Sequence, residues 1–260
     1  MLRRWQNVLI MTDILYIVGK GFSDWHNNEL RYSLRSIAKN GRNVGRIFIC
    51  GFVPYWVNTD NVVALPLQDE TNNKHYNILR AIEHAVYNSD ISKRFLYSSD
   101  DHYYTQPTDF DKYPVYWRGN DLPATMPDKP RWYDVTLKST HDCLAAFGLP
   151  TCMFAWHGNT WYDTELFKQQ RMVLLRRLAQ TMDEACEPAC LMLNYWLATD
   201  PDSMPPMVVR ADGKISAQTL VEIEQAAKVK EVLSTTDAVA ADMRTWLQRT
   251  FDKPCIYERE

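Results

Sequence analysis

The sequence predicts an α/β fold, with a mostly parallel central sheet, flanking helices and a helical C-terminal part. Over the first hundred residues, short apolar runs alternate with segments whose apolar residues recur every three or four positions. Later in the chain the helical pattern dominates. Strands that alternate with helices in this way are typical of parallel sheets covered by helices.

The first hundred residues supply the predicted sheet. In the first helical segment Leu30, Leu34 and Ile37 recur at helical spacing, and the segment ends at a glycine. The apolar runs around it are short and are bounded by turn residues. We therefore expect strands at 13–19, 46–51, 62–67 and 94–99, and helices at 28–41 and 73–88.

The remainder of the chain is less regular. Residues 105–134 are rich in Pro, Asp, Tyr and Trp, which predicts long loops with one edge strand. After them we expect a short helix, a strand, a long amphipathic helix and a Pro/Asp/Gly-rich excursion, at 137–148, 151–157, 163–182 and 199–216, and then further helices. There is no internal repeat and no clear linker. We therefore expect a single domain over 1–260, made of two halves at about 13–104 and 105–260.

Composition narrows the classes of protein that need to be considered. The chain of 260 residues has a formal net charge of −3, so no overall basic field attracts nucleic acid or anionic lipid. Its mean hydropathy is −0.39, and no apolar run approaches the roughly 20 residues of a membrane helix. The six scattered cysteines favour reduced thiols. We expect a cytoplasmic location.

Two adjacent acids follow the fourth predicted strand. In "RFLYSSDDHYY" the apolar strand runs directly into Asp100, Asp101 and His102. Neighbouring carboxylates repel each other, so they usually lie either in solvent or around a cation. If the strand order is 3-2-1-4, these acids lie beside the turn that contains Gly19 and Lys20, at the carboxyl edge of the sheet. Mn²⁺ or Mg²⁺ bound to a diphosphate suits such a site.

Basic residues on two helices suggest phosphate contacts. Lys74 and Asn77 share a face of the first turn of the helix at 73–88, and helix N-termini attract phosphate. Arg31 and Arg35 share a face of the earlier helix. They would either clamp phosphate or pair with Glu29, and the sequence leaves both readings open.

Three segments resemble the Stealth family of capsular-polysaccharide phosphotransferases and their relatives. "ELRYSLRSI" at 29–37 matches that family's pattern without a break, "PYWVN" matches at three positions, and "FLYSSDD" matches at its strand and its acids. The stretch "LSTTDAV" and the ending "PCIYE" are weaker echoes. The resemblance implies a glycosyltransferase A-like (Rossmann-like) fold that uses a nucleotide sugar. It also implies that His157 is a third metal or phosphate contact.

These observations together predict a metal-dependent glycosyltransferase that moves a sugar from a nucleotide sugar, most simply a UDP-sugar, to a hydroxyl acceptor. Donor-binding residues would be Gly19, Lys20, Arg31, Lys74 and Asn77. Metal ligands would be Asp101 and His157, with Asp100 and His102 as further candidates. An inverting reaction needs a base, for which Asp142, Asp163 and Asp237 are candidates, and we assign catalysis to Asp100, Asp101 and Asp237. The acceptor would lie over the Trp/Tyr-rich loops at 113–132 and 156–162.

Departures from the family pattern keep other functions open. The family's Val-Asp-Gly-Ser-Asp is replaced by "IVGKGFSD", with Lys20 near the position of the first acid, which favours transfer of a sugar without its phosphate. A Stealth-type sugar-1-phosphate transferase is the first alternative. A transferase acting on modified DNA bases and a non-catalytic sugar- or nucleotide-binding protein are the others.

Overall fold

The fold is built on a five-stranded sheet with the strand order β4-β3-β1-β5-β9. A computed structural model describes residues 11–19, 23, 25–156, 158–178, 186–210, 219–235 and 240–259. β1, β3, β4 and β5 are parallel to one another, and only β9 runs antiparallel to its neighbour. The strands are β1 (Thr12–Val18), β3 (Val44–Gly51), β4 (Val62–Pro66), β5 (Arg94–Ser99) and β9 (Thr160–Asp163).

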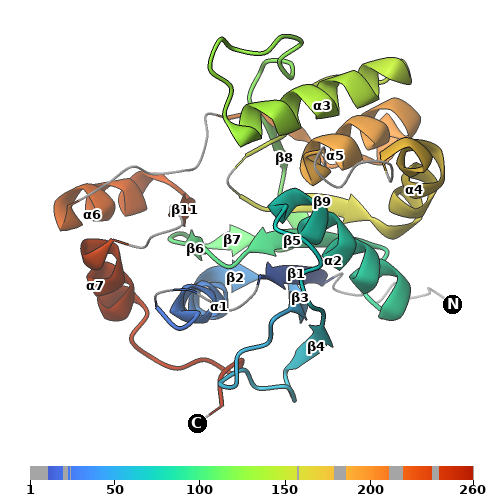
Figure 1. The fold of residues 1–260 in the computed structure, drawn as a ribbon. Coiled ribbons are helices and arrows are strands. Elements are labelled where there is room, and N and C mark those ends of the chain that lie inside the picture. Colours follow the sequence, from blue (N-terminus) through green and yellow to red (C-terminus); the bar gives the residue numbers. More distant parts are fainter. Residues whose placement is uncertain are drawn as a thin grey trace, which may run out of the picture.

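Two helical crossovers wind the sheet in opposite directions. The first passes through α1 (Asn28–Asn40) from β1 to β3, and the second passes through α2 (Lys74–Asn88) from β4 back to β5 on the other side of β1. Because such crossovers are right-handed, α1 and α2 cover opposite faces of the sheet. Figure 1 shows the sheet in the middle of the molecule with helices around it. The predicted α/β class, its mostly parallel sheet and the order 3-2-1-4 are confirmed.

The strands are apolar throughout because helices cover both faces. Ile14, Leu15 and Tyr16 of β1 follow one another and are all fully buried, as in other parallel sheets. At the end of β3 the chain needs a glycine. Gly51 has φ +108°, and a Cβ there would lie 2.1 Å from the carbonyl oxygen of Val18, so any side chain would push β3 away from β1.

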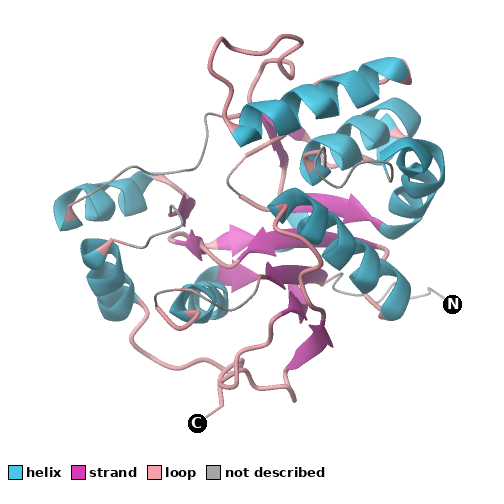
Figure 2. Ribbon diagram, viewed as in Figure 1, coloured by secondary structure: helices cyan, strands magenta, loops and turns pink. Residues whose placement is uncertain are grey.

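The second half of the chain extends the sheet and adds three helices. α3 (Trp132–Ala146), α4 (Thr164–Leu178) and α5 (Pro188–Thr199) lie together on one side of the molecule in Figures 1 and 2. The strand predicted at 151–157 is wrong, since this segment holds only an isolated bridge between Cys152 and Asp121. The strand is instead β9, whose residues pair with β5. Within the described residues, no helix has the length and apolar character needed to cross a bilayer.

Small sheets and a second core join the C-terminal part to the first half. β6 (His102–Tyr104) pairs with β11 (Val232–Ser234), β8 (Val115–Trp117) with β10 (Met207–Val209), and β2 (Gly41–Arg42) with β7 (Thr108–Asp109). α6 (Leu220–Val229) and α7 (Ala241–Thr250) pack with β6, β11 and α1 around a separate apolar cluster. The chain far beyond the acids is thereby attached to the strand that follows them.

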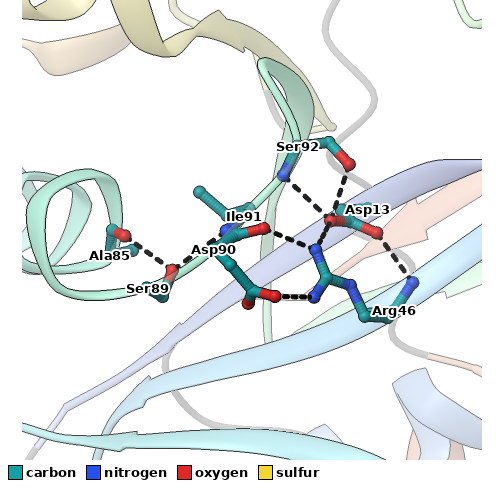
Figure 3. A network of polar contacts seen from close by, with 7 residues as sticks. All are labelled: Asp13, Arg46, Ala85, Ser89, Asp90, Ile91 and Ser92. Atoms are coloured by element: carbon teal, nitrogen blue, oxygen red, sulfur yellow. Dashed lines mark hydrogen bonds and ion pairs between the residues drawn. The ribbon is translucent and has the colours of Figure 1, made fainter.

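A buried aspartate ties the amino ends of three strands together (Figure 3). Asp13 of β1 accepts hydrogen bonds from the backbone and guanidinium of Arg46 and from the backbone and hydroxyl of Ser92, at 2.8–3.0 Å. Arg46 also pairs with Asp90 over 2.7 Å. Burial alone would raise the pKa of Asp13, but these bonds outweigh it and lower the pKa. The network lies at the edge of the sheet opposite Asp100 and Asp101, so we assign it to stability.

We expect Asp13→Asn to lower the free energy of unfolding by about 2–3 kcal/mol at pH 7, because charge-assisted bonds are lost and Arg46 loses a partner. Since folding lowers the pKa of Asp13, its contribution is complete above the ordinary value of 3.8 and is lost as the pH falls through the lowered value. Urea unfolding of the wild-type protein and of Asp13→Asn between pH 7 and pH 3 measures the contribution of Asp13 to the free energy of unfolding. The difference from wild type should shrink only at the acidic end, while the exposed Asp111→Asn should show no difference at any pH.

Candidate functional site

The candidate site lies where the strand order of the sheet reverses. β1 and β5 are neighbours and pair in parallel, with Ile17 opposite Ser99. The chain leaves β1 toward β3 and β4 and returns to β5, so the reversal lies between β1 and β5. Open α/β sheets bind ligands in the crevice beyond the carboxyl ends of such strands. Gly19 follows β1 there, and Asp100 and Asp101 follow β5, as the sequence predicts.

Asp101 is held in place by the C-terminal part of the chain. The hydroxyl of Ser234 donates to its Oδ2 over 2.9 Å, because the pairing of β11 with β6 puts Ser234 opposite His102. Oδ1 of Asp101 lies 3.9 Å from Nε2 of His102. The Asp101 side chain remains 25% exposed. Its carboxylate is therefore both positioned and accessible. The sequence analysis did not identify Ser234, which lies 133 residues away along the chain.

His102 lies beside Asp101 and does not offer a lone pair to an ion. Its side chain is buried, and the backbone N–H of Ser99 donates to its Nδ1 over 3.3 Å. An imidazole that accepts at Nδ1 carries its proton on Nε2, and Nε2 is the nitrogen that faces Asp101. A metal-binding histidine needs a free nitrogen lone pair. The predicted role of His102 as a metal ligand does not fit this arrangement.

Asp100 lies among other charges. Burial, the negative charge of Asp101 and, to a smaller extent, that of Glu29 raise the pKa of Asp100 to about 7, although the charge of Lys74 acts to lower it. Glu29 is itself buried at the start of α1, where it accepts a hydrogen bond from the Ser23 hydroxyl over 2.8 Å. Carboxylates that repel one another in a partly buried place favour a bound cation. The pair is not a simple solvent-exposed turn.

The start of α2 brings positive charge to these acids. Lys74 is the first residue of α2, and its charge acts on Asp100. The side chain of Asn73 caps the helix by accepting from the backbone N–H groups of His75 and Tyr76, at 3.0 and 3.2 Å. A phosphate at this end of α2 would therefore meet the Lys74 ammonium rather than these two amides.

Asn77 is used within the protein, contrary to the prediction that it contacts the donor. Its Oδ1 accepts from the backbone N–H groups of Glu70 and Thr71, and its Nδ2 donates to the Thr71 carbonyl over 2.8 Å. These bonds fix the loop before α2, and this loop lies close to Gly19, where a Cβ would be 3.8 Å from Asp69. Asn77 shapes the rim of the site.

Arg31 and Arg35 have a partner that the sequence analysis did not consider. Nε and Nη2 of Arg35 donate to the two carboxylate oxygens of Glu258, at 2.6 and 2.7 Å. Nε of Arg31 lies 3.3 Å from Glu258, and its guanidinium lies over the Trp56 ring. Both arginines face Glu258, whereas Glu29 accepts from Ser23. Arg31 thus helps to hold the C-terminal segment, and it also lines a pocket with residues 58–61, so its contact with the donor stays a prediction.

Three segments that carry the family resemblance meet at this point. The backbone N–H of Asn58 donates to the Tyr257 carbonyl over 2.9 Å, and that of Arg259 donates to the Trp56 carbonyl over 2.8 Å. Val57 and Glu258 form an antiparallel bridge. The loop at 58–61 and the segment at 254–259 line, with Arg31, an open pocket of about 920 Å³. We call this assembly of residues 29–37, 54–58 and 254–259 the C-terminal clasp.

Two of the candidate bases lie away from the acids. Asp163 pairs in register with Arg94, at the opposite end of β5 from Asp100, and its Oδ1 accepts from the first backbone N–H groups of α4. Asp142 is an exposed residue of α3 that pairs with Lys138. Neither is placed to act as a base at the sheet reversal. Lys20, His157 and Asp237 lie outside the described residues.

The carboxylates at the candidate site are chemically suitable ligands for a hard divalent cation. Asp100 and Asp101 offer carboxylate oxygens, which Mg²⁺ and Mn²⁺ prefer. Among the residues that the structure describes, no group of three or more His, Cys, Asp or Glu side chains could hold a metal ion. Further ligands would come from the donor, from water or from residues outside that set.

Comparison with known proteins gives likenesses among solved structures. No protein-family model and no curated protein matches the chain. Among solved structures, one described as a glycosyltransferase involved in the glycosylation of the major capsid of PBCV-1 is similar over 92% of this chain and 99% of that chain. The identity is 9% and the TM-score is 0.42.

Proposed function

We propose that the protein is a glycosyltransferase A-like enzyme that moves a sugar from a nucleotide-sugar donor to a hydroxyl acceptor and depends on a divalent metal ion. The observation that carries this proposal is the position of Asp100 and Asp101, directly beyond β5 where the strand order reverses. Partly buried acids at this crevice, with the charge of Lys74 acting on Asp100, suit a metal-bound diphosphate.

The residues would divide the work in the following way. Asp100 and Asp101 would hold Mn²⁺ or Mg²⁺, whose chemistry is to neutralise the charge that grows on the departing diphosphate. The hydrogen bond from Ser234 orients the Asp101 carboxylate, and His102 lies 3.9 Å from it. Lys74 would pair with a phosphate of the donor, for which UDP is our first choice. His157 remains a proposed metal or phosphate contact on the strength of the family resemblance, and Asp237 remains a proposed catalytic residue.

A Stealth-type sugar-1-phosphate transferase is the second candidate. It is favoured by the C-terminal clasp, in which two segments of the family pattern contact the C-terminal Pro-x-x-aromatic-Glu ending. The mass of the product separates the two reactions, because phosphate stays with the transferred sugar only in the second.

Ligand-dependent melting tests the proposed function. With Mn²⁺ present, one of UDP, GDP, CDP and ADP at 100 times its dissociation constant should stabilise the protein by about 2.7 kcal/mol and raise the melting temperature by several degrees. The shift should disappear in Asp101→Asn. The wild-type protein should also slowly hydrolyse the nucleotide sugar that corresponds to the stabilising nucleotide. Absence of a shift with all four nucleotides would contradict the proposal.

A further inference from the structure

One tryptophan is exposed beside the candidate site. Among the tryptophans that the structure describes, Trp132 alone is exposed, at 63%, and the others are buried or half-buried. Trp132 follows an exposed loop at 123–131 and is the first residue of α3. A single exposed aromatic ring is common on protein surfaces, so the meaning of Trp132 depends on the groups around it.

The backbone holds Trp132 in a defined place. The Asp134 carboxylate accepts from the backbone N–H of Arg131 over 2.8 Å and from its guanidinium at 3.1 Å. The backbone N–H of Asp134 donates to the Arg131 carbonyl over 3.0 Å. These bonds start α3 five residues before the predicted helix, and they fix the ring at the helix terminus.

Two neighbouring rings contact Trp132 and leave it exposed. The His75 ring lies 5.4 Å from it at an interplanar angle of 50°, and the Tyr133 ring lies 5.7 Å from it at 67°. His75 and Tyr133 stack on each other at 5.8 Å. Since neither ring is parallel to the indole of Trp132, the indole is not covered by stacking. We call Trp132, His75 and Tyr133 the aromatic platform.

His75 adds a polar group to this platform. It is 8% exposed, and burial, followed by the charge of Lys74, lowers its pKa to about 4, so it is neutral at physiological pH. Its Nδ1 is buried without a hydrogen-bond partner among the described residues. Buried polar atoms nearly always have a partner, so this nitrogen has hydrogen-bonding capacity left for a water molecule or a ligand group.

The aromatic platform lies near Asp100 and Asp101. His75 follows Lys74, and the charge of Lys74 acts on both His75 and Asp100. We propose that the aromatic platform is the subsite for a neutral sugar ring of the acceptor, which stacks on Trp132 and gives a hydroxyl to the free nitrogen of His75. This proposal rests on the proposed function, and it adds that the acceptor is a glycan.

The surrounding charges favour a sugar over the other ligands that stack on aromatic rings. A single-stranded nucleic acid stacks its bases in a positively charged groove that follows its phosphates. Here the guanidinium next to the platform, that of Arg131, is already paired with Asp134, and Lys74 would pair with the phosphate of the donor. The chain as a whole has a net charge of −3. A pyranose ring needs only an apolar face and a few polar groups at its edge, which Trp132 and His75 provide.

Binding of a panel of neutral oligosaccharides, without nucleotide, tests the platform. Saturation-transfer NMR or an array should find at least one hexoside or N-acetylhexosaminide that binds the wild-type protein. Trp132→Ala should weaken the affinity for this sugar about 10–100-fold, the range of one lost stacking contact. Trp132→Phe should retain most of the affinity, and His75→Phe, which keeps a ring but lacks the nitrogen, should give an intermediate loss. Tyr55→Ala, at a ring that is 88% exposed elsewhere, is the matched control.

The outcomes separate the platform from the proposed reaction. Loss of sugar binding in Trp132→Ala, with an unchanged nucleotide-dependent melting shift, supports the platform. If the wild-type protein binds sugar through Trp132 but shows no nucleotide shift, the platform stands and the transferase proposal fails. The platform is overturned if no neutral sugar binds, if Trp132→Ala binds as well as wild type, or if oligothymidine is the probe whose binding depends on Trp132.

Discussion

Replacing Asp101 by asparagine should reduce release of nucleotide from the donor sugar by at least about 100-fold, since the metal ion's electrostatic help is worth several kcal/mol. Asparagine keeps the shape and can still accept from Ser234, so the fold should be retained. It removes the negative charge that would hold the ion. Steady-state release of nucleotide, measured across a Mn²⁺ titration, tests this expectation.

The matched control is Asp111→Asn, which removes the same charge from an exposed aspartate of the short helix at 110–112. It should leave turnover, the Mn²⁺ requirement and the melting temperature unchanged. If Asp101→Asn kept the turnover and the metal requirement of wild type, Asp101 would have no part in binding an ion.

Glu258→Ala should lower the free energy of unfolding by about 3–5 kcal/mol, the usual effect of removing one partner of a buried ion pair. The Glu258 side chain is 5% exposed and that of Arg35 is 11% exposed, so the substitution leaves a buried guanidinium without its bidentate partner. Urea unfolding at pH 7 measures the loss. A double variant with leucine at both positions should recover much of the stability, because it removes the stranded charge as well.

The pH dependence of this effect has a definite sign. Burial would raise the pKa of Glu258, but the bonds from Arg35 and the backbone of Cys255 outweigh it and lower the pKa below 4.5. The contribution of Glu258 is therefore complete above pH 4.5 and is lost as the pH falls through the lowered value. The stability of wild type should approach that of Glu258→Ala only in acid. A loss below about 1 kcal/mol at pH 7 would show that the C-terminal clasp adds no more than a surface ion pair.

The first half of the fold could be predicted because its signals are local. β1 and β5 are buried apolar runs, and α1 and α2 show the helical spacing of apolar residues. The position of Asp100 and Asp101 follows from the same information, since a residue after a parallel strand lies at the carboxyl edge of the sheet.

The second half was predicted less well because its signals are not periodic. α5 was not predicted: its residues 188–196 are all buried, and a helix that is apolar on every side has no amphipathic pattern. The segment at 151–157 has the composition of a strand, but no partner strand lies next to it beyond the single bridge at Cys152. A strand forms only where a second strand lies beside it, and the sequence of one segment does not show which segments will lie beside it.

The residues themselves determined the alternation of strands and helices and the placement of two acids beyond the fourth parallel strand. Only the tertiary structure decided which partners these residues have. In the folded chain Asp101 accepts a hydrogen bond from Ser234, and Arg31 and Arg35 form ion pairs with Glu258. Asn77 accepts hydrogen bonds from the backbone of Glu70 and Thr71. The physical reason is range: hydrophobic period and turn chemistry act over a few residues, whereas the hydrogen bonds that define a side chain's role join positions up to 223 residues apart.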